Sequence, residues 1–299
     1  AATLLGKIYL RNHDYANAKT YIDMVLNSGQ YELESDFKYV WSENNKYGKE
    51  MIFALLHETG NNAAEIACHF GPSDHPEVPG RWQYYGVSLP FWRSYDKEDP
   101  RREFFYYDYT GDAKRDDQSD YGFHYMVPEE GVTVVPNDTT KYMQNVATMK
   151  YTYDMISDAY YDGRTICIFR LSDVILCKAE IENNLNGPAA ALPYLNQIRA
   201  RAGAPEYGKH NRFPAPSTKE AINDAILKER GYELVFEFQR RADLIRFGKY
   251  EEVVNAHLKK LGIAQPTNVT SSLRYFPYPL NDAQLNPNLA AENPSRLPK

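Results

Sequence analysis

The feature that most constrains this chain is a long stretch without helical periodicity, enclosed by two pairs of helical segments. The helical pairs cover residues 1–29 and 170–202, and residues 30–168 between them are rich in Gly, Pro, Asn and Asp. Long ordered loops cost chain entropy, so a loop-rich stretch of this length is usually functional or disordered. Its many aromatic residues favour an ordered and functional region.

Both helical pairs place small and large residues where two antiparallel helices would cross. The first pair is joined at Asn12-His13-Asp14, and the second is broken at Asn186-Gly187 before Pro188, a favoured first-turn residue. This spacing is typical of tetratricopeptide repeats, although two ordinary helical hairpins would fit it as well. The residues concerned are Leu5, Gly6, Tyr9, Ala18 and Ile22 in the first pair and Ala179, Ala191, Leu195 and Ile198 in the second.

Weaker patterns predict the remaining elements. Residues 50–57 are predicted as a buried strand, residues 88–95 as a short helix, and residues 104–109 and 149–153 as strands rich in aromatics. A Pro-rich loop, residues 204–217, precedes a helix capped by Ser217 or Thr218. Residues 251–261 predict another short helix, and the Pro-interrupted tail from residue 275 predicts an extended segment without a regular helix.

Composition excludes several classes of protein. The net charge of -6 and the pI near 5.7 argue against nucleic acid as the main partner, because phosphate binding needs concentrated cations. No apolar run approaches the roughly 18 residues of a membrane span. Cys68, Cys167 and Cys177 show no metal or redox spacing and are predicted to be buried free thiols.

No motif predicts catalysis, and we therefore expect a protein that is not an enzyme. His69 and His75 lie six positions apart without a set of ligands at metal-binding spacing, so neither a metal nor another cofactor is predicted. The sequence also lacks a phosphate-binding loop, a nucleophile elbow and a recognisable setting for a glycosidase carboxylate pair.

One charged stretch, residues 227–250, carries carboxylates at a spacing that a catalytic or metal site could use. If the stretch is helical, Glu229, Glu233 and Glu237 stack on one face, which suits either a carboxylate site or a charge network. Arg240 and Arg241 would reach Glu237 at i+3 and i+4. We favour the network, and expect Glu237→Ala or Arg240→Ala to lower stability far more than ligand affinity.

The chain opens with AATLLGKIYL, inside a helical pattern and without an initiator Met or a cap. We therefore interpret it as the C-terminal part of a longer protein.

Three stretches together resemble the SusD/RagB family of surface glycan-binding lipoproteins. The first is the charged motif from Glu229 to Lys249, E-R-x-x-E-L-x-x-E-x-x-R-x-x-D-L-x-R-x-G-K. The second is the closing segment FPYPLNDAQLNPNL, and the third is RLSDVILCKAE followed by ALPYLNQIRARAG. The chain departs from many family members at Phe238, where they carry Gly.

The resemblance implies a mainly α fold, a tetratricopeptide-like helical-repeat scaffold with a large irregular loop-rich region and a few short strands. It implies one domain over residues 1–299 without its N-terminal part: a helical pair (1–29), the loop-rich ligand region (30–168), a second pair (169–202), and C-terminal helices with an extended tail (203–299). It also implies a SusC-type TonB-dependent transporter as partner and a place on the outer-membrane surface. A lipid anchor in the absent N-terminal part would provide the membrane attachment.

The best candidate ligand site is the loop GPSDHPEVPGRWQYYG, residues 71–86. Glycan binding needs flat apolar faces for the C–H side of a sugar, ringed by groups that hydrogen-bond hydroxyls. Rings that merely close the loop onto the core are the alternative. The candidate residues are Trp82, Tyr84 and Tyr85 as rings, with Asp74, His75, Arg81 and Gln83 as polar contacts and Asn61 and Asn62 as weaker ones. Trp92 is predicted to lie in the core, and Trp41 could lie in either place.

Two kinds of function remain open. In the first, the chain binds an oligosaccharide without catalysis and delivers it to the transporter. In the second, it binds peptides for import, as RagB-like members do, or serves as a tetratricopeptide-type scaffold for another protein.

Overall fold

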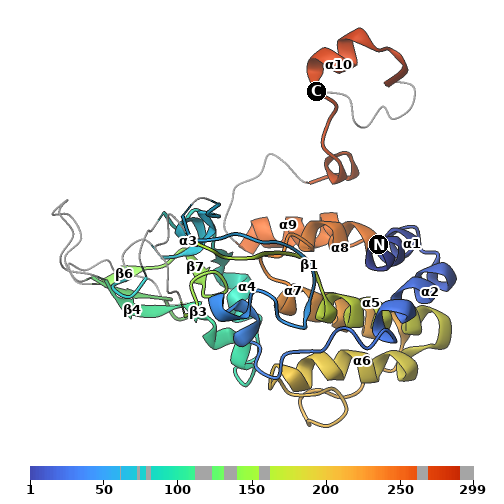
Figure 1. Cartoon of the computed structure of the whole chain (residues 1–299), viewed down its shortest axis with the longest axis horizontal. Helices are drawn as coiled ribbons and strands as arrows, with labels where there is room; N and C mark the ends of the chain where they lie inside the picture. Colours follow the sequence, from blue (N-terminus) through green and yellow to red (C-terminus); the bar gives the residue numbers. More distant parts are fainter. Residues whose placement is uncertain are drawn as a thin grey trace. The chain divides into compact units, whose positions relative to one another are not determined.

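The fold was analysed in a computed structural model that describes residues 1–60, 62–72, 75–78, 82–111, 123–130, 140–154, 162–260 and 269–289. The chain divides into two compact units, residues 1–237 and residues 238–299. Helices dominate the described part, as predicted, and the strands are short. Figure 1 shows the elements in chain order.

The first helical pair forms as predicted, from α1 (Ala2–Arg11) and α2 (Tyr15–Leu26). Asp14 caps α2, because its carboxylate accepts a hydrogen bond from the Asn17 backbone N–H at 3.1 Å. Gly6 lets the two helices approach closely, since a Cβ there would stand 2.9 Å from side-chain carbons of Ile22. Leu10, Ala18 and Ile22 are buried between the helices.

The second pair, α5 (Leu171–Asn186) and α6 (Pro188–Arg201), also forms at the predicted positions. Gly187 ends α5 with a φ of 90°, and Pro188 opens α6. Helix α7 (Lys219–Glu233) packs on this pair and is capped by Thr218, whose hydroxyl accepts from the Ala221 N–H at 3.1 Å. Helix α2 packs on α5, so the two pairs share one core.

Short strands organise the loop-rich region into three small sheets. Antiparallel β1 and β8 form the first, β7 lies between antiparallel β2 and β3 in the second, and β5 lies between antiparallel β4 and parallel β6 in the third. The strands are β1 (Met51–Leu55), β2 (Val87–Ser88), β3 (Phe105–Tyr106), β4 (Asp108–Thr110), β5 (His124–Met126), β6 (Thr140–Tyr142), β7 (Asn145–Thr148) and β8 (Ile166–Arg170). The same region holds the helices α3 (Ile66–Phe70) and α4 (Leu89–Arg93) and the 3-10 turns η1 (Tyr39–Trp41), η2 (Glu43–Asn45) and η3 (Pro100–Glu103).

Two strand predictions were wrong in detail. The predicted buried strand at residues 50–57 is β1, but Phe53 and Leu55 are about half exposed because β8 is its one partner among the described residues. Residues 149–153, predicted as a strand, form a turn, and the strand is the preceding β7. The turn places Lys150 and Tyr151 in the interior, where Lys150 donates a hydrogen bond to the carbonyl of Glu233 at the end of α7 and Tyr151 donates one to the carbonyl of Phe236.

Aromatic side chains fill the core beneath the loop-rich region. Trp92 is buried, as predicted, and its indole N–H donates to the Arg102 carbonyl at 3.2 Å. Trp41, for which the sequence left both places open, is buried against the ring of Tyr151. The cysteines are free and buried, as predicted.

The charged stretch is not one continuous helix. Helix α7 ends at Glu233, and α8 (Arg240–Arg246) begins after a turn in which Phe236 and Phe238 both have a φ of 60°. This left-handed conformation suits Gly best, which accounts for the Gly that many family members carry at the position of Phe238.

The second unit consists of α8, α9 (Tyr250–Lys260), η4 (Ser271–Arg274) and α10 (Leu280–Leu285). Arg274 binds Glu251 of α9 through Nε at 2.6 Å and Nη2 at 3.0 Å. The short helix α10 corrects the prediction that the tail lacks a regular helix: it begins directly after Pro279, so Pro does not interrupt it.

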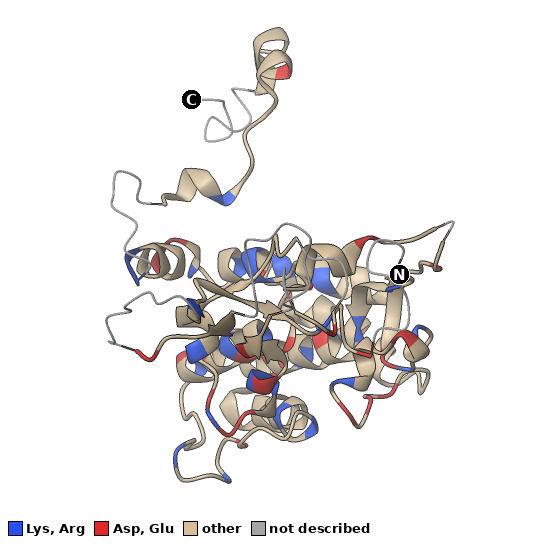
Figure 2. Cartoon of the chain, turned by 90° about the vertical axis from the view of Figure 1, so that its left-hand side faces the viewer, with Lys and Arg blue, Asp and Glu red and all other residues tan. Residues whose placement is uncertain are grey.

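No helix in the described part of the chain is both long and apolar enough to cross a bilayer. Among the described residues, acidic and basic positions are interspersed over the view in Figure 2.

Candidate functional site

Three of the predicted ligand-binding rings gather around one histidine, His69 of α3. The ring centroids of Trp82, Tyr84 and Tyr85 lie 5.0, 5.5 and 6.3 Å from the His69 centroid. All three rings remain open to solvent, with exposed fractions of 39%, 65% and 52%. We call these four residues the aromatic platform.

The backbone of the platform is fixed to α3. The Trp82 N–H donates to the Cys68 carbonyl at 2.9 Å, and the Tyr85 N–H donates to the His69 carbonyl at 3.2 Å. The residue between the rings, Gln83, has a φ of 45°. The rings on either side of it, Trp82 and Tyr84, stand with their centroids 5.4 Å apart and their planes at 33°.

Further contacts connect the platform to the core. Tyr85 packs on Phe70 with centroids 5.1 Å apart, and Phe70 packs on the buried Tyr151 at 4.7 Å. The Gln83 amide donates to the Asn145 side chain on β7 at 3.1 Å. Rings held in this way lose little conformational freedom when a ligand binds, which favours affinity.

The chemistry of the platform suits binding rather than nucleophilic attack. Exposed indole and phenol faces accept the C–H side of a sugar or an apolar side chain, while the phenol edges can hydrogen-bond. The nearest thiol is inert, because burial and the neighbouring Glu65 carboxylate raise the pKa of Cys68 to about 11.

The other predicted residues divide into three groups. His75 packs its ring against Tyr106 and Tyr109, at centroid distances of 4.8 and 5.0 Å. Asn62 braces its own loop, since its amide donates to the Leu56 carbonyl at 3.3 Å and its backbone carbonyl accepts from Glu58 at 3.2 Å. The remaining three, Asn61, Asp74 and Arg81, lie outside the described residues.

His69 is the member of the platform that sequence reasoning missed. The sequence offered it only as a metal-ligand candidate together with His75, and among the described residues no group of three or more His, Cys, Asp or Glu is arranged to hold a metal. Its position in a helix directly before the buried Phe70 was the available signal, but the rings it contacts lie 13 to 16 positions further along the chain.

Glu229, Glu233 and Glu237, which we call the glutamate ladder, are buried inside the protein in a charge network. Arg170 donates to Glu237 through Nε at 2.7 Å and to Glu233 through Nη1 at 2.7 Å. The described residues that make up the network are Glu50, Asp99, Glu229, Glu233 and Glu237 with Arg101, Lys150, Arg170, Arg199 and Arg201.

Electrostatics in this network confirm the interpretation as architecture. Burial acts to raise the pKa of Glu233, but the guanidinium groups of Arg201, Arg170 and Arg101 outweigh it and hold that pKa well below its usual range. The sequence predicted that a cation in its own helix would pair with Glu237, and the structure pairs Glu237 with Lys150 of the loop-rich region and with Arg170 at the end of β8. A glutamate that is fully neutralised and closed to solvent cannot contact a ligand.

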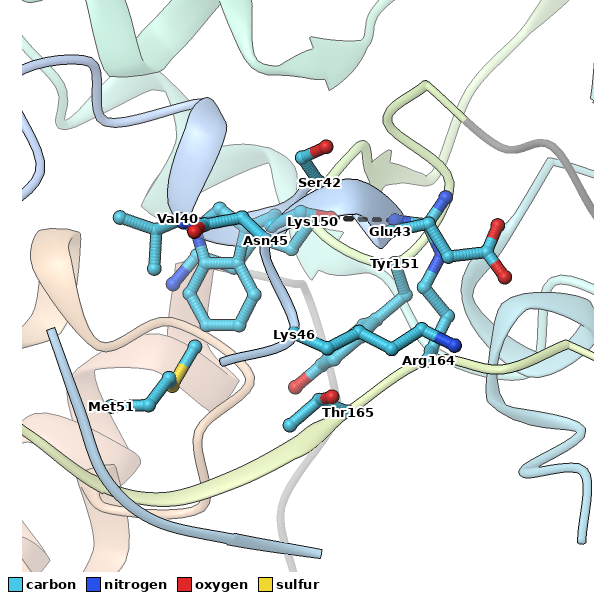
Figure 3. Close-up of a pocket in the computed structure, with 11 residues that line it drawn as sticks. Val40, Ser42, Glu43, Asn45, Lys46, Met51, Lys150, Tyr151, Arg164 and Thr165 are labelled. Atoms are coloured by element: carbon cyan, nitrogen blue, oxygen red, sulfur yellow. Dashed lines mark hydrogen bonds between the residues drawn. The ribbon is translucent and has the colours of Figure 1, made fainter. Parts of the chain in front are cut away.

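Figure 3 shows a small cavity beside the network, lined by Lys150, Arg164 and Thr165 among other residues. Its volume of about 10 Å³ is roughly what one water molecule needs. Three polar atoms that line it have no hydrogen-bond partner within the described structure: Trp41 Nε1, Arg164 Nε and Thr165 Oγ1. The cavity therefore suits a buried water and excludes a saccharide.

Comparison with known proteins agrees with this fold. The model of the SusD family matches residues 49–295. SusD-like protein P25 of Formosa agariphila is 39% identical over 120 residues, which are 40% of this chain and 22% of that protein. SusD-like protein P2 of the same organism is 25% identical over 98% of this chain and 58% of its own length.

A solved structure shows the same architecture. Surface glycan-binding protein A from Bacteroides thetaiotaomicron, in complex with laminarihexaose, aligns with a TM-score of 0.69 and 22% identity. The alignment covers 95% of this chain and 61% of that one, so the chain spans about three fifths of the solved relative. By its sequence match over most of its length, the chain belongs to the SusD family.

Proposed function

We propose that the chain captures oligosaccharides at the cell surface without catalysis and delivers them to a TonB-dependent outer-membrane transporter of the SusC type. The observation that carries this proposal is the aromatic platform, in which Trp82, Tyr84 and Tyr85 present exposed ring faces on a backbone fixed to α3. The laminarihexaose bound by one solved relative and the chain's resemblance to the SusD/RagB family of surface glycan-binding lipoproteins support it.

Polar groups near the rings complete the proposed site. Gln83 lies between Trp82 and Tyr84, and it shares a hydrogen bond with Asn145, which is exposed. Sugar hydroxyls would exchange hydrogen bonds with such amides while the rings cover the C–H face. Asn61, Asp74 and Arg81 of the adjoining loops are proposed as further contacts, whereas Asn62 and His75 are proposed to shape the loops.

The test is isothermal titration of the full chain with gluco-oligosaccharides of β-1,3 and α-1,4 linkage, and with a mixture of short peptides. Removing one stacked ring weakens binding by roughly three- to tenfold, so Tyr84→Ala and Trp82→Ala are expected to lower sugar affinity by this factor. Tyr47→Ala is the matched control, because Tyr47 is 78% exposed and lies outside the platform.

Binding of peptides without binding of any sugar would contradict the proposal and favour the RagB-like alternative. If Tyr84→Ala, Trp82→Ala and Tyr47→Ala all bind sugar with equal affinity, the platform is not the sugar site.

The partner is tested separately. We propose a lipid-anchored position on the outer-membrane surface, beside the transporter. Co-purification of the full-length protein with a TonB-dependent transporter encoded next to it is expected, and a full-length protein that purifies without any transporter would contradict the delivery step.

A further inference from the structure

A second concavity in the first unit lies between α2, α5 and α6, and it shares no lining residue with the aromatic platform. In Figure 1 these helices stand at the right-hand side of the view, and α3 stands to the left. The volume of the concavity, about 490 Å³, falls within the roughly 300–1,000 Å³ of small-ligand sites. We call it the repeat groove.

The walls of the repeat groove combine two aromatic rings with uncharged polar groups. Tyr31 and Tyr194 supply the rings, and Asn27 and Gln197 supply side-chain amides. Within the described part of the chain, the two hydroxyls and the two amides make no hydrogen bond to another residue. Their donors and acceptors are therefore available to a ligand.

The floor of the groove is apolar and carries one ionised carboxylate. Leu171 and Ile175 are buried beneath it. Asp23 accepts from Lys178 Nζ at 2.5 Å through Oδ1 and from Lys19 through Oδ2. A carboxylate offers about four lone-pair positions, so Asp23 retains acceptor sites for ligand hydroxyls.

The charges in the groove disfavour anions. Lys178 is the one cation among its lining residues, and it is already bound to Asp23 and, at 2.7 Å, to Glu182. A peptide carboxyl terminus or a phosphate would therefore meet no unpaired cation among the lining residues, because the carboxylates of Asp23 and Glu32 already pair with lysines. A neutral ligand rich in hydroxyls meets rings, amides and a carboxylate acceptor instead.

We propose that the repeat groove is a second saccharide site, for short neutral oligosaccharides that lie against Tyr31 and Tyr194 and hydrogen-bond to Gln197 and Asp23. This site does not depend on the aromatic platform. Two sites on one chain raise the avidity for a long polysaccharide whenever the polysaccharide can reach both.

The test isolates the groove by removing the platform. The double variant Trp82→Ala/Tyr84→Ala of the full chain is titrated with laminarihexaose and maltohexaose. Tyr194→Ala and Gln197→Ala are then added to it singly. Both residues lie on the surface of α6, and Gln197 is exposed, so far-ultraviolet circular dichroism should show an unchanged fold.

Residual binding by the platform double variant, weakened roughly three- to tenfold by Tyr194→Ala and also weakened by Gln197→Ala, is the expected result. Complete loss of sugar binding in the double variant would overturn the second site while supporting the proposed function. Residual binding that neither groove substitution changes would overturn it as well. Sugar binding that depends on Tyr194 but not on Trp82 or Tyr84 would support the groove and contradict the platform.

Discussion

Arg170 and Glu237 form a bidentate ion pair although they lie 67 positions apart in the sequence. Arg170 Nε donates to Glu237 Oε2 at 2.7 Å, and Nη2 donates to Oε1 at 2.8 Å, in a site closed to solvent. Parallel bonds of this kind add geometric specificity to charge attraction. The pair fixes the turn after α7 against the end of β8, so Glu237 stabilises the scaffold.

Removing one side of this pair should be costly. Glu237→Ala leaves Arg170 and Lys150 with less neutralising charge in the interior, and a loss of about 3–5 kcal/mol in the free energy of unfolding is expected. Urea unfolding measures it, and titration with the best sugar ligand should show an unchanged affinity. Lys209→Ala is the control, because Lys209 is exposed and its pair with the partly buried Glu206 should contribute less than about 1 kcal/mol. A Glu237→Ala variant with normal stability and weakened sugar binding would contradict the architectural role.

The buried Asp173 should make the free energy of unfolding fall at acid pH. Burial alone would raise the pKa of Asp173, but Lys7 and Arg230 lower it well below the ordinary 3.8. The unfolded chain therefore binds the proton first as the pH falls, so this stabilisation is complete above about pH 5 and is lost progressively below it.

Asp173→Asn tests this by comparison with the unsubstituted chain. At pH 7 the variant should be less stable by about 3–5 kcal/mol, because the buried Arg230 and the partly buried Lys7 lose an anionic partner. The difference should shrink as urea unfolding is repeated at pH 5, 4 and 3.5. A difference that stays constant over this range would contradict the assigned pKa shift.

Close packing of the first helical pair depends on Gly6. A valine there would press against Ile22, and overpacking of this kind costs about 1–3 kcal/mol. Thermal or urea unfolding of Gly6→Val measures the loss. Ala16→Val is the matched control, since Ala16 is exposed on α2 and its substitution adds the same β-branched residue to a helix without a clash.

His69 should position the platform rings. In His69→Ala the rings of Trp82 and Tyr84 lose a ring that contacts both of them, and sugar affinity is expected to fall roughly three- to tenfold. His69→Phe retains an aromatic ring and should restore most of the affinity. If both variants bind sugar equally weakly, the imidazole nitrogens rather than the ring contacts are responsible.

Helical periodicity was enough to place the repeat pairs. Each pair carries its small and large residues over three or more turns, and the boundaries at Asn186-Gly187 and Thr218 follow from local backbone chemistry. Short strands offer too few positions for an alternating pattern to be recognised. The strand was therefore predicted at residues 149–153, whereas the structure forms it just before them, as β7.

The features that the sequence did not predict depend on contacts between residues far apart in the chain. Nothing near Trp41 in the sequence indicates burial, because the ring of Tyr151 that covers it lies 110 positions away. Glu237 after the break in the charged helix pairs with Arg170, which lies 67 positions away, and no local pattern contains that information. The aromatic platform was predictable as a cluster of rings, whereas its histidine required the fold.

The charge network also bears on how the chain reaches its native state. Its hydrogen bonds join residues that are 120, 132 and 151 positions apart, such as Arg170 with Glu50, Arg101 with Glu233 and Arg201 with Glu50. Contacts over such distances close large loops before they contribute stability, and folding slows as their share rises. Assembly of this network should therefore be a late event in folding, and until it is complete each of its charges remains hydrated.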